Sequence, residues 1–345
     1  MKKILFYIFS VITLFSCGSS KKVIYTPELQ QIQTVYVEKE TKNVVTDHEM
    51  NLLSLLKQGC RNFNTSPIAS DSTWEGRLQV RLQELCASPI FNRSQLGLVV
   101  YDITAGKYLF SVNGDHRMRP ASCQKLVTAI SALSLLGANY SFIPQIDEAG
   151  EGWCWDDDIT SEMPYLATRK WRMKDVLTPM MKDSDNRLAE SLFWQLSKIG
   201  GGKFGDLKSV VPNIEKVLQR AGIPKGSGYR IADGSGLSLY NYITPNMLNA
   251  LLVYAWVEQG IRTHLIPTLP IGGVDGTLKN RFHDTKAYNN IFAKTGTVTG
   301  VSSLSGYANG GNGHVLSFCI INQGLERGGI ARHFQDLVCK AITEQ

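Results

Sequence analysis

The chain has 345 residues, of which 43% are hydrophobic and 19% are charged, an ordinary globular composition with enough apolar residues for a sizeable core. Its formal net charge is +6, and because Lys2 and Lys3 lie in a predicted leader the mature value is about +4 (6 − 2). There is no basic run and no basic–aromatic stripe, which disfavours nucleic-acid binding.

The N-terminus has the pattern of an export signal. Two lysines precede an apolar run over residues 4–15, which is too short to span a bilayer comfortably. The run ends in "LFSC", which resembles a bacterial lipobox. We therefore expect residues 1–17 to be a lipoprotein signal peptide with a lipid on Cys17. The protein would then be exported, periplasmic, and anchored through that lipid to a membrane of the bacterial cell envelope.

Residues 18–75 are polar with short apolar pieces, which is typical of a tether that could hold one helix. From residue 76 to residue 345 the pattern is that of a globular domain. The six cysteines other than Cys17 are scattered and lack C-x-x-C spacing, so we predict neither a disulfide framework nor a zinc site. The sequence offers no cofactor motif, and we expect no cofactor and no metal.

Strands are predicted near both ends of the globular domain, with helices between them. "LGLVVYDI" and "YLFSV" predict a hairpin, and apolar spacing after Pro120 predicts a helix that stops at Gly137. The clearest later helices are "RLAESLFWQLSK", "NIEKVLQRAG" and "NMLNALLVYAWVEQG". "NIFAKTGTVT", "SSLSGYAN" and "HVLSFCIINQ" predict strands, and "GGIARHFQDLVCKAI" predicts a terminal helix. We expect an α/β (α+β) fold: one antiparallel sheet flanked by helices, a helical subdomain, and a site in the groove between these parts.

The stretch that begins at Pro120 offers a candidate nucleophile. Ser122 and Lys125 lie three residues apart and would share one face of the predicted helix, about one turn from each other. A hydroxyl at a helix N-terminus lies in a positive dipole field, and a neutral amine beside it could take its proton. Alone, the S-x-x-K pattern is weak, because an N-cap serine followed by a solvated lysine has the same sequence.

Two further motifs change this interpretation. Ser184-Asp185-Asn186 precedes a predicted helix, and Lys294-Thr295-Gly296 lies on a predicted strand. S-x-x-K, S-D-N and K-T-G in this order are the motif set of penicillin-binding proteins and class A β-lactamases. The three motifs follow one another at intervals of 62 residues (122 to 184) and 110 residues (184 to 294), which suit a compact transpeptidase-like core.

Longer segments carry a more specific resemblance. "RPASCQKLVTA", "DSDNRLAE", "IADGSGLS", "FAKTGTVTGVSSLSGYA" and "GLVVYDITAGKYLFSVN" are similar to the D-alanyl-D-alanine carboxypeptidase/endopeptidase family. These are the class C penicillin-binding proteins of the penicillin-binding protein 4 type. The resemblance covers residues from about 80 to the end, and it implies the penicillin-binding/β-lactamase-like transpeptidase fold.

The resemblance implies a serine-type D-Ala-D-Ala carboxypeptidase, with endopeptidase activity as an addition, that acts on peptidoglycan stem peptides. Ser122 would attack the carbonyl of the terminal D-Ala–D-Ala bond, and Lys125 would take its proton. Ser184 would relay a proton to the leaving amine, while Asn186 would hold Lys125 and the substrate backbone. β-Lactam antibiotics would acylate the same serine as covalent inhibitors.

The third motif would bind the other end of the substrate. Lys294 and the hydroxyls of Thr295 and Thr297, on either side of Gly296, would hold the terminal carboxylate. The oxyanion would lie between the backbone N–H groups of Ser122 and Thr297. Such preorganised donors are usually the largest catalytic contribution.

The chain departs from the family pattern in two ways. Family members usually carry large inserted domains between the first two motifs, and we expect them to be missing from the 62-residue interval (122 to 184). Cys123 follows the candidate nucleophile where the family has Ser or Thr. Because Cys123 would point roughly 100° away from Ser122 on a helix, we expect a small buried side chain there and not a nucleophile.

Two other functions compete with the carboxypeptidase. A serine β-lactamase would need an additional base, and the nearest match to the E-x-x-L-N loop of class A enzymes, "EKVLQ" at Glu215, lies in a regular predicted helix. A non-catalytic peptidoglycan-binding lipoprotein would need none of the motif residues, and all of them are present. The sequence therefore favours the carboxypeptidase.

Overall fold

The computed structural model describes residues 72–143, 170–226, 228–325 and 327–344. The predicted signal peptide, Cys17 and most of the predicted tether lie outside these residues. Within them, no helix combines the length and the apolar character that a membrane-spanning segment needs.

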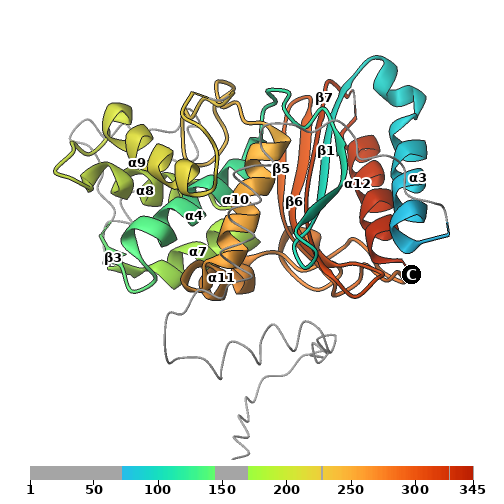
Figure 1. Cartoon of the computed structure of the whole chain (residues 1–345). Coiled ribbons are helices and arrows are strands. Elements are labelled where there is room, and N and C mark those ends of the chain that lie inside the picture. Colours follow the sequence, from blue (N-terminus) through green and yellow to red (C-terminus); the bar gives the residue numbers. More distant parts are fainter. Residues whose placement is uncertain (1–71, 144–169, 227, 326, 345) are drawn as a thin grey trace, which may run out of the picture.

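A five-stranded antiparallel sheet forms the centre of the molecule (Figure 1). Its strand order is β2-β1-β7-β6-β5, so the first two strands join the last three, as the sequence predicts. The strands are β1 (Gln95–Asp102), β2 (Lys107–Val112), β5 (Ile291–Val298), β6 (Val301–Asn309) and β7 (Val315–Gln323). The third motif lies on β5, an edge strand of this sheet.

Two helices cover one face of the sheet, α3 (Trp74–Cys86) and α12 (Gly328–Thr343). The larger helical part lies against the opposite face. It consists of α4 (Gln124–Leu136), α7 (Met173–Lys182), α8 (Asn186–Gln195), α9 (Leu207–Arg220), α10 (Pro245–Val257) and α11 (Gln259–Leu265). A small second sheet pairs β3 (Ser141–Phe142) with β4 (Trp171–Arg172).

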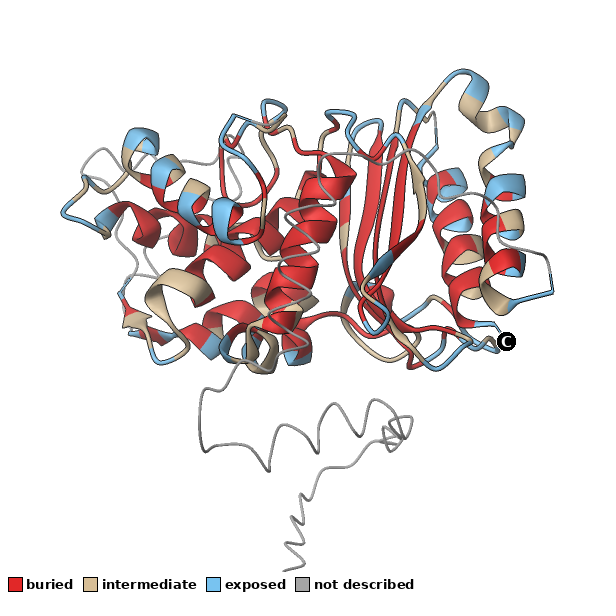
Figure 2. Ribbon diagram, viewed as in Figure 1, coloured by how far each residue is buried: buried red, intermediate tan, exposed pale blue. Residues whose placement is uncertain are grey.

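The sheet separates two hydrophobic cores, which Figure 2 shows as buried residues on both of its faces. Along β1, Leu98 and Val100 belong to the core under α3 and α12, whereas Val99 and Tyr101 belong to the core on the helical side. Successive side chains of a strand point to opposite faces. Because both faces are covered, β1 is apolar along nearly its whole length instead of alternating with polar residues.

The helix that follows the first motif is buried deeply in the helical part. In α4, ten consecutive residues from Gln124 to Leu133 are buried, as expected for a helix that is apolar around most of its circumference. It ends at Gly137, whose φ of 80° suits a residue without a Cβ atom, as predicted. The helix predicted over residues 246–260 ends at Val257 in the structure, because Glu258 (ψ 96°) leaves the helical conformation, and a separate helix, α11, begins at Gln259.

Candidate active site

Ser122 lies in a single 3-10 turn, Ala121–Cys123, that leads directly into α4. Its side chain is partly accessible, while Lys125, one turn further along, is fully buried. Lys125 Nζ lies 3.0 Å from Ser122 Oγ. The structure therefore brings the two residues of the first motif into hydrogen-bonding contact, as their three-residue spacing predicts.

Lys125 Nζ has two further acceptors. It donates to Asn186 Oδ1 at 2.6 Å and to the Ser235 carbonyl oxygen at 2.8 Å. A neutral lysine amine has two N–H bonds and one lone pair. When the amine is neutral and its two N–H bonds point at Asn186 and Ser235, the lone pair faces the Ser122 hydroxyl, which is the orientation that a general base for this serine needs.

The second motif owes its position to a strained turn and a helix cap. Ser184 has a φ of 63°, the left-handed region that non-glycine residues rarely occupy. Asp185 is the N-cap of α8, and its side chain accepts the backbone N–H of Leu188 at 3.0 Å. Asn186 then begins the helix and faces Lys125, while Ser184 Oγ lies on the other side against Lys294.

The third motif places a buried lysine, Lys294, on β5. Its Nζ donates to Ser184 Oγ at 2.9 Å and to the Thr295 carbonyl at 2.8 Å, and its side chain is fully buried. Burial, and to a smaller extent the positive charge of Lys125, together lower the pKa of Lys294 to about 7. An anion bound here would be attracted to the amine and would favour its protonated form.

Strand β5 passes very close to the candidate nucleophile. A Cβ atom added to Gly296 would lie 2.9 Å from the Ser122 backbone nitrogen and 2.7 Å from the Pro120 carbonyl oxygen. Only a residue without a side chain permits this approach. The approach brings the end of β5, where Thr297 is exposed, close to the turn that carries Ser122.

Of the substrate-binding residues predicted on β5, Thr297 lines an open space. A cavity of about 380 Å³ adjoins Thr297 and is lined by the β5–β6 turn together with Leu325, Gly328 and Ala331. Thr295 Oγ1 donates to Thr277 Oγ1 at 2.8 Å. Thr277 follows a glycine in a short 3-10 turn (Gly276–Leu278), and no feature of the sequence singles it out.

Cys123 is a buried structural residue. Its thiol donates to the Lys294 carbonyl at 3.2 Å and accepts the Ser303 hydroxyl at 3.2 Å. Burial raises the pKa of the Cys123 thiol to about 11, which opposes formation of the reactive thiolate. Both partners belong to the sheet, in β5 and β6, so the side chain ties the turn that carries Ser122 to the sheet.

The segment "IADGSGLS", whose resemblance to the family places its turn near the site, has no role that the sequence predicts, and the structure shows that this turn holds Lys125 from behind. Ser235 contributes its backbone carbonyl, and the carboxylates of Glu190 and Asp233 accept N–H groups of the same turn. A backbone carbonyl has no signature in the residue types. The one signal was the run of glycines and serines around Asp233, which indicates a turn and not its purpose.

Part of the chain is similar in sequence to a known carboxypeptidase. D-alanyl-D-alanine carboxypeptidase DacB of Haemophilus influenzae is 32% identical over 160 residues, which are 46% of this chain and 33% of that protein. The chain thus matches about a third of the length of this curated relative.

Solved structures share the fold. Penicillin-binding protein 4 of Haemophilus influenzae, in complex with a β-lactam, superposes with a TM-score of 0.61 at 18% identity, over 74% of this chain and 99% of that one. The extended-spectrum β-lactamase TLA-1 superposes with a TM-score of 0.58 at 14% identity, over 79% of this chain and 98% of that one. Both likenesses establish the β-lactamase/transpeptidase-like fold that the motifs predict.

The family itself is identified by the sequence. The model of the D-Ala-D-Ala carboxypeptidase 3 (S13) family matches residues 78–156 and 160–336, which together span all three motifs. The matched residues are also those that build the sheet, the helical part and the lysine-centred site described above. The chain therefore belongs to the D-Ala-D-Ala carboxypeptidase 3 (S13) family.

Proposed function

We propose that this chain is a serine-type D-Ala-D-Ala carboxypeptidase that hydrolyses the terminal peptide bond of peptidoglycan stem peptides through an acyl-enzyme on Ser122. One observation carries the proposal: Lys125 Nζ lies 3.0 Å from Ser122 Oγ and is held there by Asn186 and the Ser235 carbonyl. Membership of the S13 family supports the choice of substrate.

The reaction begins with proton transfer from the Ser122 hydroxyl to the neutral amine of Lys125. The serine oxygen forms a bond to the carbonyl carbon of the penultimate D-Ala, and the negative charge on the carbonyl oxygen is held by the backbone N–H groups of Ser122 and Thr297. The C–N bond then breaks, and the departing amine of D-Ala takes a proton by way of Ser184. Water finally hydrolyses the ester and restores the serine hydroxyl.

The third motif would recognise the free C-terminus of the substrate peptide. The protonated amine of Lys294 lies beside Ser184 Oγ, so a carboxylate bound at Lys294 brings the scissile bond close to both serines. The hydroxyls of Thr295 and Thr297 would donate to the carboxylate oxygens. A buried cation with few competing partners binds a carboxylate more strongly than an exposed one would.

The β-lactamase alternative lacks its deacylating base. Glu215 lies inside the regular helix α9, and its carboxylate accepts the Tyr229 hydroxyl at 3.2 Å and pairs with Lys225 at 3.3 Å. Both partners belong to the outer helical part and not to the Ser122 site. We therefore expect penicillin to acylate Ser122 and the acyl-enzyme to persist. Rapid, repeated penicillin turnover would contradict this expectation.

The activity test is release of D-Ala from a peptide that ends in D-Ala-D-Ala. The wild-type protein should release one D-Ala per peptide, and Ser122→Ala should reduce the rate to the background of uncatalysed hydrolysis. A peptide that ends in L-Ala is the control substrate and should remain intact. If Ser122→Ala retained the wild-type rate, the proposed nucleophile would be wrong.

We also propose that the protein is exported and attached to a cell-envelope membrane by a lipid on Cys17. The lysines at the start, the apolar run over residues 4–15 and the lipobox-like "LFSC" support this proposal. A radioactive fatty acid supplied to the cells should label the wild-type protein and not Cys17→Ser. Equal labelling of both proteins would refute the anchor.

A further inference from the structure

A buried carboxylate lies one layer behind the catalytic lysine. Glu190 is on α8 and is only 4% exposed. One of its oxygens accepts the Ser235 backbone N–H at 2.8 Å, and both lie 3.2 Å from the Gly234 backbone nitrogen. The donors to this carboxylate thus belong to one turn: two backbone amides and the Ser235 side chain.

The same turn contacts Lys125 with its opposite side. The carbonyl of Ser235 accepts from Lys125 Nζ at 2.8 Å, while the N–H of the same residue donates to Glu190. On α4, the Thr128 hydroxyl donates to the Gly234 carbonyl at 2.8 Å. The turn is therefore held between α8 and α4, with Glu190 on one side and Lys125 on the other.

A second carboxylate shapes the rest of the turn. Asp233 accepts the backbone N–H groups of Gly236 at 2.7 Å and Ser238 at 2.6 Å, together with the side-chain amide of Asn241 at 2.6 Å. Gly236 has a φ of 89°, and a Cβ atom there would lie 1.9 Å from the Ala121 carbonyl oxygen. The turn thus packs directly against the backbone that carries the nucleophile.

This arrangement is electrostatically costly. Burial, and to a smaller extent the negative charge of Asp233, raise the pKa of Glu190 to about 7, while hydrogen bonds from the Ser235 side chain and from the backbone N–H groups of Gly234 and Ser235 oppose the rise. A fold that needed only to satisfy two amides could use a neutral side chain. A charged acceptor makes stronger, shorter hydrogen bonds and so restricts the amides, and hence the Ser235 carbonyl, more tightly.

We propose that Glu190 is a positioning residue for Lys125. By clamping the N–H groups of Gly234 and Ser235, it sets where the Ser235 carbonyl lies. That carbonyl occupies one N–H bond of the lysine amine and so determines whether the amine's lone pair faces the Ser122 hydroxyl. The inference rests on the proposed function, because it assigns Glu190 a part in the proton transfer from Ser122.

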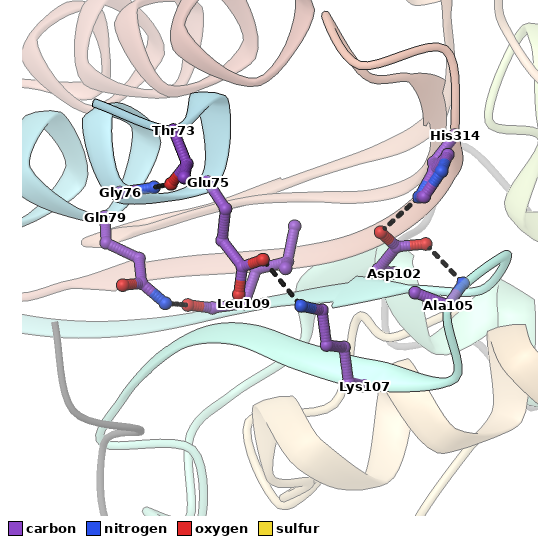
Figure 3. Close-up of polar contacts among 9 residues, drawn as sticks. All are labelled: Thr73, Glu75, Gly76, Gln79, Asp102, Ala105, Lys107, Leu109 and His314. Carbon is purple, nitrogen blue, oxygen red and sulfur yellow. Dashed lines mark hydrogen bonds and ion pairs between the residues drawn. The ribbon is translucent and has the colours of Figure 1, made fainter. Parts of the chain in front are cut away.

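The test is the pre-steady-state acylation of the full chain by a fluorescent penicillin. In Glu190→Gln the amide oxygen can take the place of Oε1 and still accept from Ser235 and Gly234, but the NH₂ group then takes the place of Oε2 and faces the Gly234 N–H, so the turn is held less tightly. We expect the maximal acylation rate to fall by about tenfold to a hundredfold. The half-saturating concentration should stay within about twofold, because it depends on Lys294 and the threonines of β5. Asp102→Asn, which alters a buried carboxylate at the other end of the sheet, is the matched control and should keep the wild-type rate (Figure 3).

The amount of penicillin bound at the end of the reaction separates positioning from folding. A residue that only stabilised the fold would lower this amount and leave the rate constant of the folded fraction unchanged. Glu190→Gln with full labelling at the wild-type rate would overturn the proposal, as would a change confined to the half-saturating concentration.

A milder variant covers the case in which Glu190→Gln yields no folded protein. Thr128→Val keeps the shape of the side chain and removes its hydrogen bond to Gly234, so the maximal rate should fall roughly threefold to tenfold. A wild-type rate in Thr128→Val would then overturn the proposal. If the wild-type protein itself neither bound penicillin nor released D-Ala, the proposed function would be the part that fails.

Discussion

Buried ionisable side chains have different kinds of neighbours at the two ends of the central sheet. At the end away from the site, Asp102 is 1% exposed, and its two oxygens accept the Ala105 backbone N–H and contact His314 Nδ1, each at 2.8 Å (Figure 3). At the site, groups that can carry the same charge lie in pairs: Lys125 is near Lys294, and Glu190 is near Asp233.

We infer from this difference that the Asp102 end contributes to the stability of the fold, whereas the site contributes to the proposed reaction. The Asp102 end satisfies each oxygen with one donor and fixes the hairpin between β1 and β2, whose Lys107 also pairs with Glu75 of α3 (Figure 3). The site instead keeps groups whose pKa values are displaced, which destabilises the folded protein and equips it for proton transfer. Variants at the site should therefore change rates, and variants at the Asp102 end should change stability.

The largest effect on activity is expected from a substitution that fills the narrow space between β5 and the turn that carries Ser122. Gly296→Ala would bring a methyl group within 2.9 Å of the Ser122 nitrogen, so the strand and the nucleophile turn must separate. Because this disturbs both expected oxyanion donors, the acylation rate should fall about a hundredfold or more. Stopped-flow acylation by penicillin measures it.

Gly329→Ala is the matched control for this variant. Gly329 lies in the first turn of α12, and an added Cβ would meet no atom within 4 Å. The control should keep the wild-type acylation rate. Equal rates in the two variants would mean that the close approach of β5 to Ser122 has no role in the reaction.

An intermediate effect is expected from pH. The pKa of Lys294 is lowered from its ordinary value of 10.5 to about 7, so the amine loses its positive charge as the pH rises through this value. If the charged amine binds the substrate carboxylate, kcat/KM should fall by about tenfold per pH unit above this pKa. The measurement is D-Ala release across pH 6 to 9, on the order of one assay per half unit.

A substrate with an amidated C-terminus is the control for the pH profile. It carries no charge for Lys294 to attract, so its much slower hydrolysis should lack the decline above the Lys294 pKa. A parallel decline for the amide and the free acid would assign the titration to another group of the site and would contradict carboxylate recognition by Lys294.

The smallest effect on activity is expected at the other end of the sheet. Asp102→Asn replaces an acceptor of the Ala105 N–H or of His314 by an amide NH₂ group. The free energy of unfolding should fall by about 1–3 kcal/mol, while kcat/KM stays within about twofold. Urea unfolding and D-Ala release measure the two quantities. A large loss of activity without a loss of stability would contradict the assignment of a structural role to the Asp102 end.

Sequence reasoning succeeded where side chains carry the signal. Ser122 and Lys125, three residues apart, predicted a shared helix face, and the structure places their side chains in contact. The apolar run of β1 and its turn predicted the hairpin correctly. In each case the physical requirement, a helical period or a strand buried on both faces, restricts which residue types can occupy the segment.

Sequence reasoning failed where a backbone group, and not a side chain, makes the contact at the site. The Ser235 carbonyl is available in every residue type, and only tertiary packing brings it to Lys125. Thr277 lies beside Thr295 because a turn from another part of the chain packs there. The lowered pKa of Lys294 depends on its burial and on a second lysine that is 169 residues away in the sequence (294 − 125).

The central claim, that Ser122 is the nucleophile and Lys125 its base, is tested most directly by mapping the residue that penicillin labels. The protein is incubated with penicillin and digested, and the modified peptide is sequenced by mass spectrometry. The account predicts one penicilloyl group on Ser122 and none on Cys123, whose thiol has a pKa raised to about 11 by burial. A label on Cys123, or no label on the folded protein, would contradict it.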